Sequence, residues 1–151
     1  MSIVKSVVNS NENRKTLLIK RVDKILEENF KNKIITFLGV TFKPNTDDMR
    51  EASSIPMIKY LNKKSCKIKY YDPSGEKDDF KGFKNVDYCS TISAACLKTD
   101  LVILHTEWND FKLLNFKKLI KKRKFKIYDM RNLYSQLKMK KLDIDYFGVG
   151  R

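Results

Sequence analysis

The stretch FLGVTFKPNTDDMREASS, residues 37–54, contains the side chains best suited to bind an anion. An apolar run ends at a glycine, and charged residues follow it directly. Lys43 and Arg50 are cations that can neutralise phosphate groups, while Asp47 and Asp48 are acceptors that can hold those cations and nearby backbone N–H groups. Two adjacent carboxylates in a chain passing from strand to helix point in different directions, which disfavours a catalytic acid–base pair. The pattern indicates a binding loop organised by its own acidic residues.

Three further segments carry charged or aromatic side chains directly after an apolar run. Asp72 follows CKIKYY, His105 follows DLVIL, and Arg131 lies just after KFKIYD. His105 is the only histidine in the chain. Trp108 and Phe111, which come next, are expected to pack into the core. Charged and aromatic groups thus follow each of these runs, as a binding edge requires.

The elements that would position these residues alternate between strand and helix. Strand patterns recur at 33–40, 66–73, 100–106, 124–132 and 142–151, with helices between them and a polar loop at 74–87. The alternation predicts an α/β, Rossmann-like fold of three layers, in which a parallel sheet has helices on both faces. Ligands of such sheets bind beyond the carboxyl ends of the strands. The charged segments should therefore meet at one edge of the sheet.

A long N-terminal helix, residues 3–30, is expected to precede the sheet. Leu18, Val22 and Ile25 form one apolar stripe along it. We expect this helix to pack against something outside the domain, such as a partner subunit or another domain. Farther along the chain, Ser53 or Ser54 is expected to cap the helix that follows the charged loop.

The net charge of +14 admits three interpretations: nucleic-acid binding, an anionic small ligand, or a general bias toward lysine. Among the 32 basic residues six are arginine, which leaves 32 − 6 = 26 lysines. Arginine, and not lysine, makes the bidentate contacts that read bases. We therefore expect no nucleic-acid partner and favour lysine bias, with an anionic small ligand next.

The remaining composition is that of one globular domain of 151 residues. No segment approaches the apolar length of a membrane span, and the N-terminus does not have the pattern of a signal peptide. The three cysteines, Cys66, Cys89 and Cys96, have neither metal-ligand nor disulfide spacing, which favours the reducing cytoplasm and no metal site. No G-x-G-x-x-G occurs, so the chain should not hold NAD in the usual way.

Five motifs in order along the chain resemble one family. LGVTFKPNTDDMREASS, YYDPSG, LVILHTEWNDF, IYDMRN and YFGVGR are similar to segments of the C-terminal domain of the UDP-glucose/GDP-mannose dehydrogenase family. VVNSNENRK is similar to the end of that family's central helix. The pattern is closest to the UDP-glucose 6-dehydrogenase branch.

The resemblance implies a function for the whole enzyme and a part in it for this chain. Such enzymes oxidise UDP-glucose to UDP-glucuronate in two NAD-dependent steps through a catalytic cysteine. NAD is bound mainly by an N-terminal domain, and the C-terminal domain binds the UDP-sugar. Residues 1–31 would be the end of the central, dimer-forming helix, and residues 32–151 the nucleotide-sugar-binding domain. The partners would be the two missing domains and a second copy through the N-terminal helix.

Site residues are implied in the same way. Phe42, Lys43 and Arg131 match residues that contact the substrate. The family does not generally need a histidine at the position of His105, so the resemblance implies that it is a bystander rather than a general base. Arg50 matches the arginine that reaches NAD bound to the neighbouring domain, unless it only forms an ion pair with an aspartate of its own loop.

Thr46, Asp47 and Asp48 would organise that loop by accepting backbone N–H groups and by orienting Lys43 and Arg50. No catalytic residue is expected in this chain. We expect it to be inactive alone and to be either an expressed fragment or a truncated gene product. The alternatives are a stand-alone nucleotide-sugar-binding module, or a dehydrogenase of UDP-N-acetylmannosamine or GDP-mannose.

Overall fold

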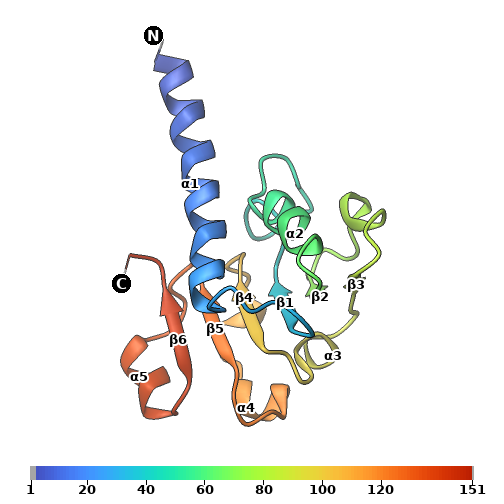
Figure 1. Ribbon diagram of the computed structural model, residues 1–151, viewed down its shortest axis with the longest axis vertical. Helices are drawn as coiled ribbons and strands as arrows, with labels where there is room; N and C mark the ends of the chain where they lie inside the picture. The colour runs from blue at the N-terminus through green and yellow to red at the C-terminus, as the bar shows by residue number, and fades with distance from the viewer. Residues whose placement is uncertain (1–2, 151) are drawn as a thin grey trace.

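Six parallel strands form one sheet in the order β3–β2–β1–β4–β5–β6 in the computed structural model, which describes residues 3–150 (Figure 1). Helices lie on both faces, so the predicted Rossmann-like α/β fold is confirmed. The strands are β1 (Ile34–Leu38), β2 (Lys67–Tyr71), β3 (Val86–Tyr88), β4 (Leu101–Leu104), β5 (Lys126–Asp129) and β6 (Asp145–Gly148). The helices are α1 (Ile3–Ile25), α2 (Ser54–Asn62), α3 (Ile92–Cys96), α4 (Phe116–Ile120) and α5 (Gln136–Lys141), with 3-10 turns η1 (Asp78–Phe80) and η2 (Asn109–Phe111).

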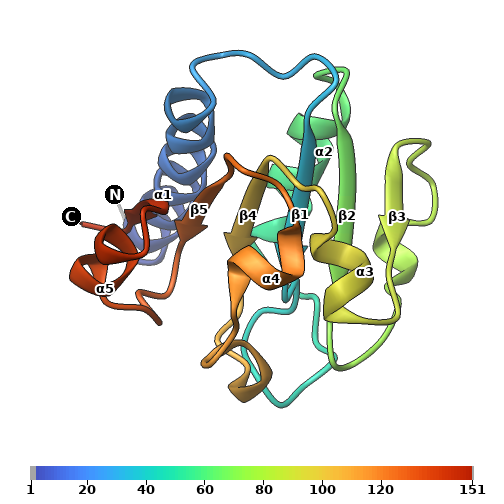
Figure 2. The ribbon, with the colours of Figure 1, turned by 90° about the horizontal axis from the view of Figure 1, so that it is seen from below.

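Helices α1 and α2 cover one face of the sheet, and α3, α4 and α5 cover the other (Figure 2). On the first face Val22 of α1 and Met57 of α2 belong to the same apolar cluster as Phe37 of β1. On the second face Phe116 of α4 packs in one cluster with Leu38 of β1. Strand β1 therefore contributes alternate side chains to two cores, which explains its nearly continuous apolar sequence. As expected for the turn after β4, the side chain of Phe111 is fully buried and Trp108 packs against the second cluster.

The prediction of a polar loop at 74–87 and a five-stranded sheet was wrong in one detail, because β3 adds a short edge strand. Its register places Ile68 beside Val86 and Tyr70 beside Tyr88. The three residues of β3 are only partly covered. Such a short strand has too few alternating positions to stand out in a sequence rich in charged residues.

Helix α1 is shorter than predicted and ends at Ile25. The next turn closes with backbone hydrogen bonds from Glu27 N–H to the Lys24 carbonyl (3.1 Å) and from Glu28 N–H to the Asp23 carbonyl (2.9 Å). Glu27 and Glu28 both have left-handed φ values, 53° and 57°. This arrangement is a helix end usually marked by glycine, and the absence of glycine concealed it in the sequence.

The first half of α1 extends away from the sheet (Figure 1). Ile3, Val4, Val7 and Val8 lie on this part, and all four side chains are more than half exposed. No helix within residues 3–150 has the length and the apolar character needed to cross a bilayer.

The prediction that a serine side chain caps α2 was wrong. Ser53 occupies the N-cap position, but its φ of −68° and ψ of −14° are helical and its hydroxyl makes no capping bond. Instead, Ser54 Oγ donates to the Val40 carbonyl at 2.5 Å, and Ser53 Oγ lies 2.8 Å from His105 Nε2. Both hydroxyls therefore tie the start of α2 to the segments that follow β1 and β4.

Candidate functional site

A cleft of about 520 Å³ lies between α1 and the carboxyl edge of the sheet, where β1, β4 and β5 end. Phe42 and Lys43 enter it from the loop after β1, and Arg131 enters it from the segment after β5. The three residues expected to contact substrate thus line one cleft. The other lining residues come from α1, from the segment just before α2, and from the segments that follow β4 and β5; they are Asn11, Arg14, Lys15, Leu18, Glu51, Ser53, His105, Glu107 and Met130.

The charge of the cleft favours an anion. Its lining holds four cationic side chains and two carboxylates. One pair neutralises itself, because Lys15 Nζ lies 3.0 Å from a carboxylate oxygen of Glu51. That hydrogen bond raises the pKa of Lys15. Three cations and one carboxylate remain, a balance suited to a ligand with two negative charges, such as a diphosphate.

The start of the loop after β1 is held by contacts on two sides. Gly39 has a φ of +78°, and a Cβ there would lie 2.6 Å from Thr106 Cβ, so glycine is required. The Asp72 carboxylate accepts from the backbone N–H groups of Val40 (2.8 Å) and Thr41 (3.3 Å). The Thr106 hydroxyl donates to the Thr41 carbonyl at 2.8 Å. The backbone that presents the next two residues is therefore fixed before any ligand arrives.

Phe42 and Lys43 combine a fixed backbone with free side chains. The Phe42 N–H donates to the Asp48 carbonyl (3.0 Å), and the Lys43 carbonyl accepts from the Thr41 hydroxyl (3.0 Å). The Phe42 side chain is 48% exposed, and within residues 3–150 Lys43 has no ion-pair partner. An apolar ring and a cation are thus available at the mouth of the cleft.

The residues expected to organise the loop differ in what they do. Thr46 Oγ1 accepts from the Asp48 N–H at 3.2 Å. Asp48 in turn accepts from Arg50 three times, at the backbone N–H (2.9 Å), Nε (3.0 Å) and Nη2 (3.1 Å). These hydrogen bonds lower the pKa of Asp48. Asp47 is exposed and makes no hydrogen bond to residues 3–150. Arg50 is 90% exposed and lies outside the cleft lining, so its guanidinium is braced by Asp48 while facing solvent.

Arg131 is positioned through the buried end of β5. The Asp129 carboxylate is fully buried and accepts from the Arg131 N–H (3.1 Å), the Tyr134 N–H (3.0 Å) and the Tyr146 hydroxyl (2.7 Å). The Arg131 side chain then donates from Nε to the His105 carbonyl at 2.8 Å. The guanidinium is therefore anchored to the segment directly after β4, in a residue that lines the cleft.

His105 is more closely tied to the site than its expected bystander role implies. Its side chain is 1% exposed, with Nδ1 2.9 Å from Thr106 Oγ1 and Nε2 2.8 Å from Ser53 Oγ. Burial, and to a smaller extent the charge of Arg131, lower the pKa of His105 to about 3. The ring is therefore neutral at physiological pH, and it is too weak a base to remove a proton from a substrate.

The contribution of α1 to the cleft was missed from the sequence. Arg14 and Asn11 lie on the same helix face as Leu18 and Val22, about one and two turns before Leu18 respectively. The apolar stripe faces the sheet, so its polar continuation faces the edge of the sheet. The spacing of these residues placed them on one face of the helix, but only the packing of α1 shows that this face borders the cleft.

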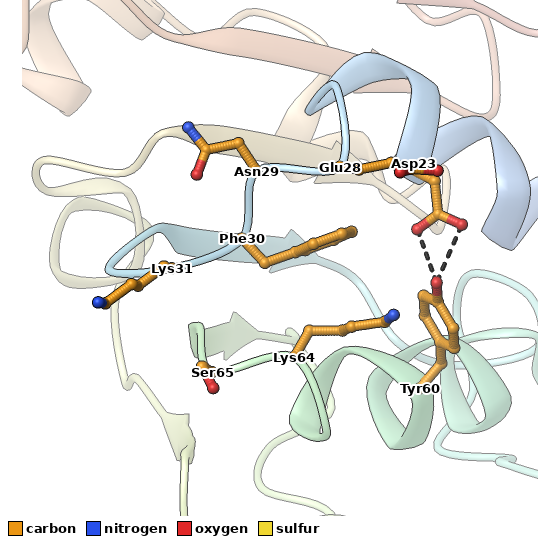
Figure 3. Close-up of a pocket in the computed structure, with 8 residues that line it drawn as sticks. All are labelled: Asp23, Glu28, Asn29, Phe30, Lys31, Tyr60, Lys64 and Ser65. Carbon is orange, nitrogen blue, oxygen red and sulfur yellow. Dashed lines mark hydrogen bonds between the residues drawn. The ribbon is translucent and has the colours of Figure 1, made fainter.

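A second cleft, of about 490 Å³, lies where α1 ends and α2 ends, close to the start of β1 (Figure 3). There the Tyr60 hydroxyl donates to both carboxylate oxygens of Asp23, at 2.8 and 2.9 Å. The Lys64 ammonium lies over the rings of Phe30 (5.6 Å) and Tyr60 (4.9 Å). These groups satisfy one another, so this cleft is a brace between α1 and α2 rather than a vacant anion site.

No activated thiol or metal site is present among residues 3–150. Cys66 and Cys96 are buried, Cys89 is half-buried, and all three are free. Burial raises the pKa of each thiol, that of Cys96 to about 12, so none is a ready nucleophile. Within the same residues no three histidine, cysteine, aspartate or glutamate side chains cluster as metal ligands would.

The chain is similar in sequence to a known protein family. Residues 36–136 match the family model described as "UDP-glucose/GDP-mannose dehydrogenase family, UDP binding domain". The UDP-glucose 6-dehydrogenase of Rickettsia felis is 34% identical over 151 residues, which cover 98% of this chain and 34% of that enzyme. The chain thus spans about a third of the length of the relatives it matches.

Solved structures of dehydrogenases have a domain with the same fold. A UDP-glucose dehydrogenase from Pyrobaculum islandicum superposes with a TM-score of 0.73 at 25% identity, covering 96% of this chain and 31% of that one. The GDP-mannose dehydrogenase of Pseudomonas aeruginosa, solved as a ternary complex, gives a TM-score of 0.65 at 16% identity over 97% of this chain and 33% of that one. The second likeness concerns the fold alone.

Proposed function

Since the chain belongs to the UDP-glucose/GDP-mannose dehydrogenase family, we propose that residues 32–151 bind the nucleotide part of a UDP-sugar. The whole enzyme would oxidise UDP-glucose to UDP-glucuronate with two NAD. One observation carries the proposal: Phe42 and Lys43, from the loop after β1, line one cationic cleft at the carboxyl edge of the sheet together with Arg131, which follows β5 much later in the sequence. This edge is where open parallel sheets bind ligands.

The cleft offers a separate group for each part of a nucleotide diphosphate. Lys43 and Arg131 are the cations for the two phosphates, and Arg14 of α1 adds a third on the opposite wall. The exposed ring of Phe42 can pack on the base or on the sugar. A diphosphate bridging these cations would offset their mutual repulsion, which favours ligand binding over an empty cleft.

NAD is the proposed cofactor of the whole enzyme, held mainly by a domain other than this one. Arg50 is the proposed contact from this chain, and its exposed guanidinium braced by Asp48 supports that assignment. The bracing fixes the direction of the side chain while leaving most of it free to meet a neighbouring domain.

The proposed division of the chain is a helix end at 1–31 and a binding domain at 32–151. We propose that the first half of α1 contacts a second copy of the chain. The exposed side chains of Ile3, Val4, Val7 and Val8 support this, since burying them would remove apolar surface from water. Sedimentation of the chain and of a Val4→Lys, Val7→Lys variant tests the proposal, and a monomeric wild type would contradict it.

This chain is expected to produce no NADH from UDP-glucose when tested alone. Its three thiols are not activated, and its sequence has no glycine-rich turn for a dinucleotide. NADH formed by the isolated chain would contradict this part of the proposal. The free thiols are also consistent with a reducing cytoplasm as the location.

The identity of the sugar is a second question. GDP-mannose and UDP-N-acetylmannosamine are the alternatives, and a stand-alone binding module is the alternative to an enzyme domain. Every nucleotide sugar named here contains a diphosphate, so a cationic cleft fits each of these ligands equally. Only the base and sugar can distinguish them.

Thermal unfolding of the chain with UDP-glucose, UDP-N-acetylmannosamine, GDP-mannose or UDP tests the proposal directly. The variant is Lys43→Ala, and the matched control is Lys59→Ala, which removes an exposed lysine of α2 outside the cleft. We expect the uridine ligands to raise the melting temperature of the wild type and of the control, and to raise that of Lys43→Ala much less.

Two outcomes would contradict the proposal in different ways. Equal shifts in Lys43→Ala and the control would mean that the ligand binds outside this cleft. A larger shift with GDP-mannose than with the uridine ligands would replace the proposed substrate class while keeping the site.

A further inference from the structure

A chain of hydrogen bonds runs from the cleft into the core through Ser53, His105 and Thr106. Ser53 Oγ lies 2.8 Å from His105 Nε2, His105 Nδ1 lies 2.9 Å from Thr106 Oγ1, and Thr106 Oγ1 lies 2.8 Å from the Thr41 carbonyl oxygen. It joins the start of α2 to the segments after β4 and β1. Ser53 is its only half-buried side chain and lines the cleft, whereas the other side chains are buried.

The Thr41 carbonyl, at the inner end of this series of hydrogen bonds, fixes the direction of each hydrogen bond in it. A carbonyl oxygen can only accept, so the Thr106 hydroxyl proton points to Thr41. Thr106 Oγ1 must then accept from His105, which places a proton on Nδ1. A neutral imidazole carries one N–H, so Nε2 has none and accepts the Ser53 hydroxyl proton.

The environment of the ring supports the neutral form that this reasoning needs. His105 is 1% exposed, and the Arg131 guanidinium donates to its carbonyl at 2.8 Å. Burial and a neighbouring positive charge both oppose a second proton on the ring. The same conditions exclude a serine nucleophile activated by histidine, because this imidazole cannot hold the proton that Ser53 would release.

We propose that Ser53 Oγ is an acceptor-only recognition group that selects a ligand with an N–H or O–H donor at this point of the cleft. Its proton is committed to His105, and no other group within residues 3–150 donates to the oxygen. The inference rests on the proposed function for the kind of ligand. In a uridine diphosphate the donor is either the imide N–H of uracil or a ribose hydroxyl. His105 acts as a positioning residue through Ser53.

The first experiment needs no ligand. His105 is the only histidine, so all imidazole cross-peaks in long-range 1H–15N spectra of an untagged, 15N-labelled chain come from this one ring. We expect the pattern of the tautomer protonated at Nδ1, and the same pattern in the Ser54→Ala variant, which removes a neighbouring hydroxyl outside this chain of bonds. A ring protonated at Nε2 would overturn the inference, whatever the ligand.

The second experiment measures the affinity of wild type, Ser53→Ala and Ser54→Ala for UDP, N3-methyl-UDP, 2′-deoxy-UDP and 3′-deoxy-UDP. We expect Ser53→Ala to weaken UDP binding about fivefold, the usual effect of losing one hydrogen bond. One analogue should bind wild type more weakly by a similar factor and be insensitive to Ser53→Ala. That analogue identifies the donor as uracil or ribose.

The outcomes separate this inference from the proposed function. If wild type binds UDP and Ser53→Ala binds every ligand with wild-type affinity, Ser53 is not a recognition group although the cleft is the nucleotide site. The same conclusion follows if Ser53→Ala weakens all four ligands equally. If wild type binds no UDP, the proposed function fails, and acceptor-only recognition of a uridine ligand fails with it.

Discussion

Acidification should destabilise the domain through His105, because the ring is buried and neutral in the folded chain. Burial, with a smaller effect from Arg131, lowers the pKa of His105 from 6.5 to about 3. Between these values the unfolded chain binds a proton that the folded chain does not. The free energy of unfolding therefore decreases as the pH falls from 6.5 toward 3, and the stabilisation from the neutral ring is fully present above 6.5.

The two pKa values set the size of this effect. The free energy changes by about 1.4 kcal/mol for each pH unit in the window where only the unfolded chain is protonated. Lowering the pH from ~7 to ~5 crosses about 1.5 units of that window and should cost about 2 kcal/mol. A domain of this size is stable by only about 5–15 kcal/mol, so the loss is measurable.

Urea unfolding followed by circular dichroism at pH ~7, ~6 and ~5 measures this effect in wild type and in His105→Gln. The glutamine amide oxygen can accept the Ser53 hydroxyl proton, but the amide does not titrate. Both chains share the same carboxylates, so the difference between their pH slopes isolates His105. Parallel slopes would show that the folded ring binds a proton at a nearly normal pKa and would refute the buried, neutral ring.

Three further changes test the contacts that shape the site. Gly39→Ala should destabilise the domain by about 2–4 kcal/mol in urea unfolding, since it combines a left-handed φ with a clash; an unchanged midpoint would refute the close approach. Tyr146→Phe should cost about 1–3 kcal/mol in the same assay because Asp129 loses a buried donor, and a neutral result would mean that water replaces the hydroxyl. Iodoacetamide should label Cys89 before Cys96 in the native chain by mass spectrometry, because burial raises the pKa of Cys96 to about 12; labelling in the reverse order would contradict this burial.

Most of the fold could be predicted because strand and helix patterns are local. The run Leu101–Leu104 is fully buried, and its uninterrupted apolar sequence indicated a central strand. The errors occurred where the local signal was weak. Strand β3 is three residues long, and α1 ends at Ile25 with a left-handed Glu27 where glycine is usual. Ser53 uses its hydroxyl for a contact with a residue 52 positions away rather than for a cap.

The sequence by itself determined which chemistry gathers at the carboxyl edge of the sheet. Charged residues follow the ends of β1 and β5, and parallel strands bring those ends together. This is why charged residues after β1 and β5 could be expected at one edge of the sheet, whereas the assignment of Phe42, Lys43 and Arg131 as substrate contacts came from the family resemblance. The same logic did not distinguish Asp48, which braces Arg50, from Asp47, which makes no such bond, because side-chain direction within a loop depends on the backbone path.

Only the tertiary structure decided how that edge becomes a cleft. The packing of α1 against the sheet supplies the wall of the cleft that contains Arg14. Nothing within a single segment specifies how far α1 lies from the edge of the sheet. The packing of α2 beside β4 places Ser53 against His105, and the Thr41 carbonyl then fixes the direction of each proton. Local patterns determine the elements, whereas the donors and acceptors of a site depend on contacts between residues that only the folded chain brings together.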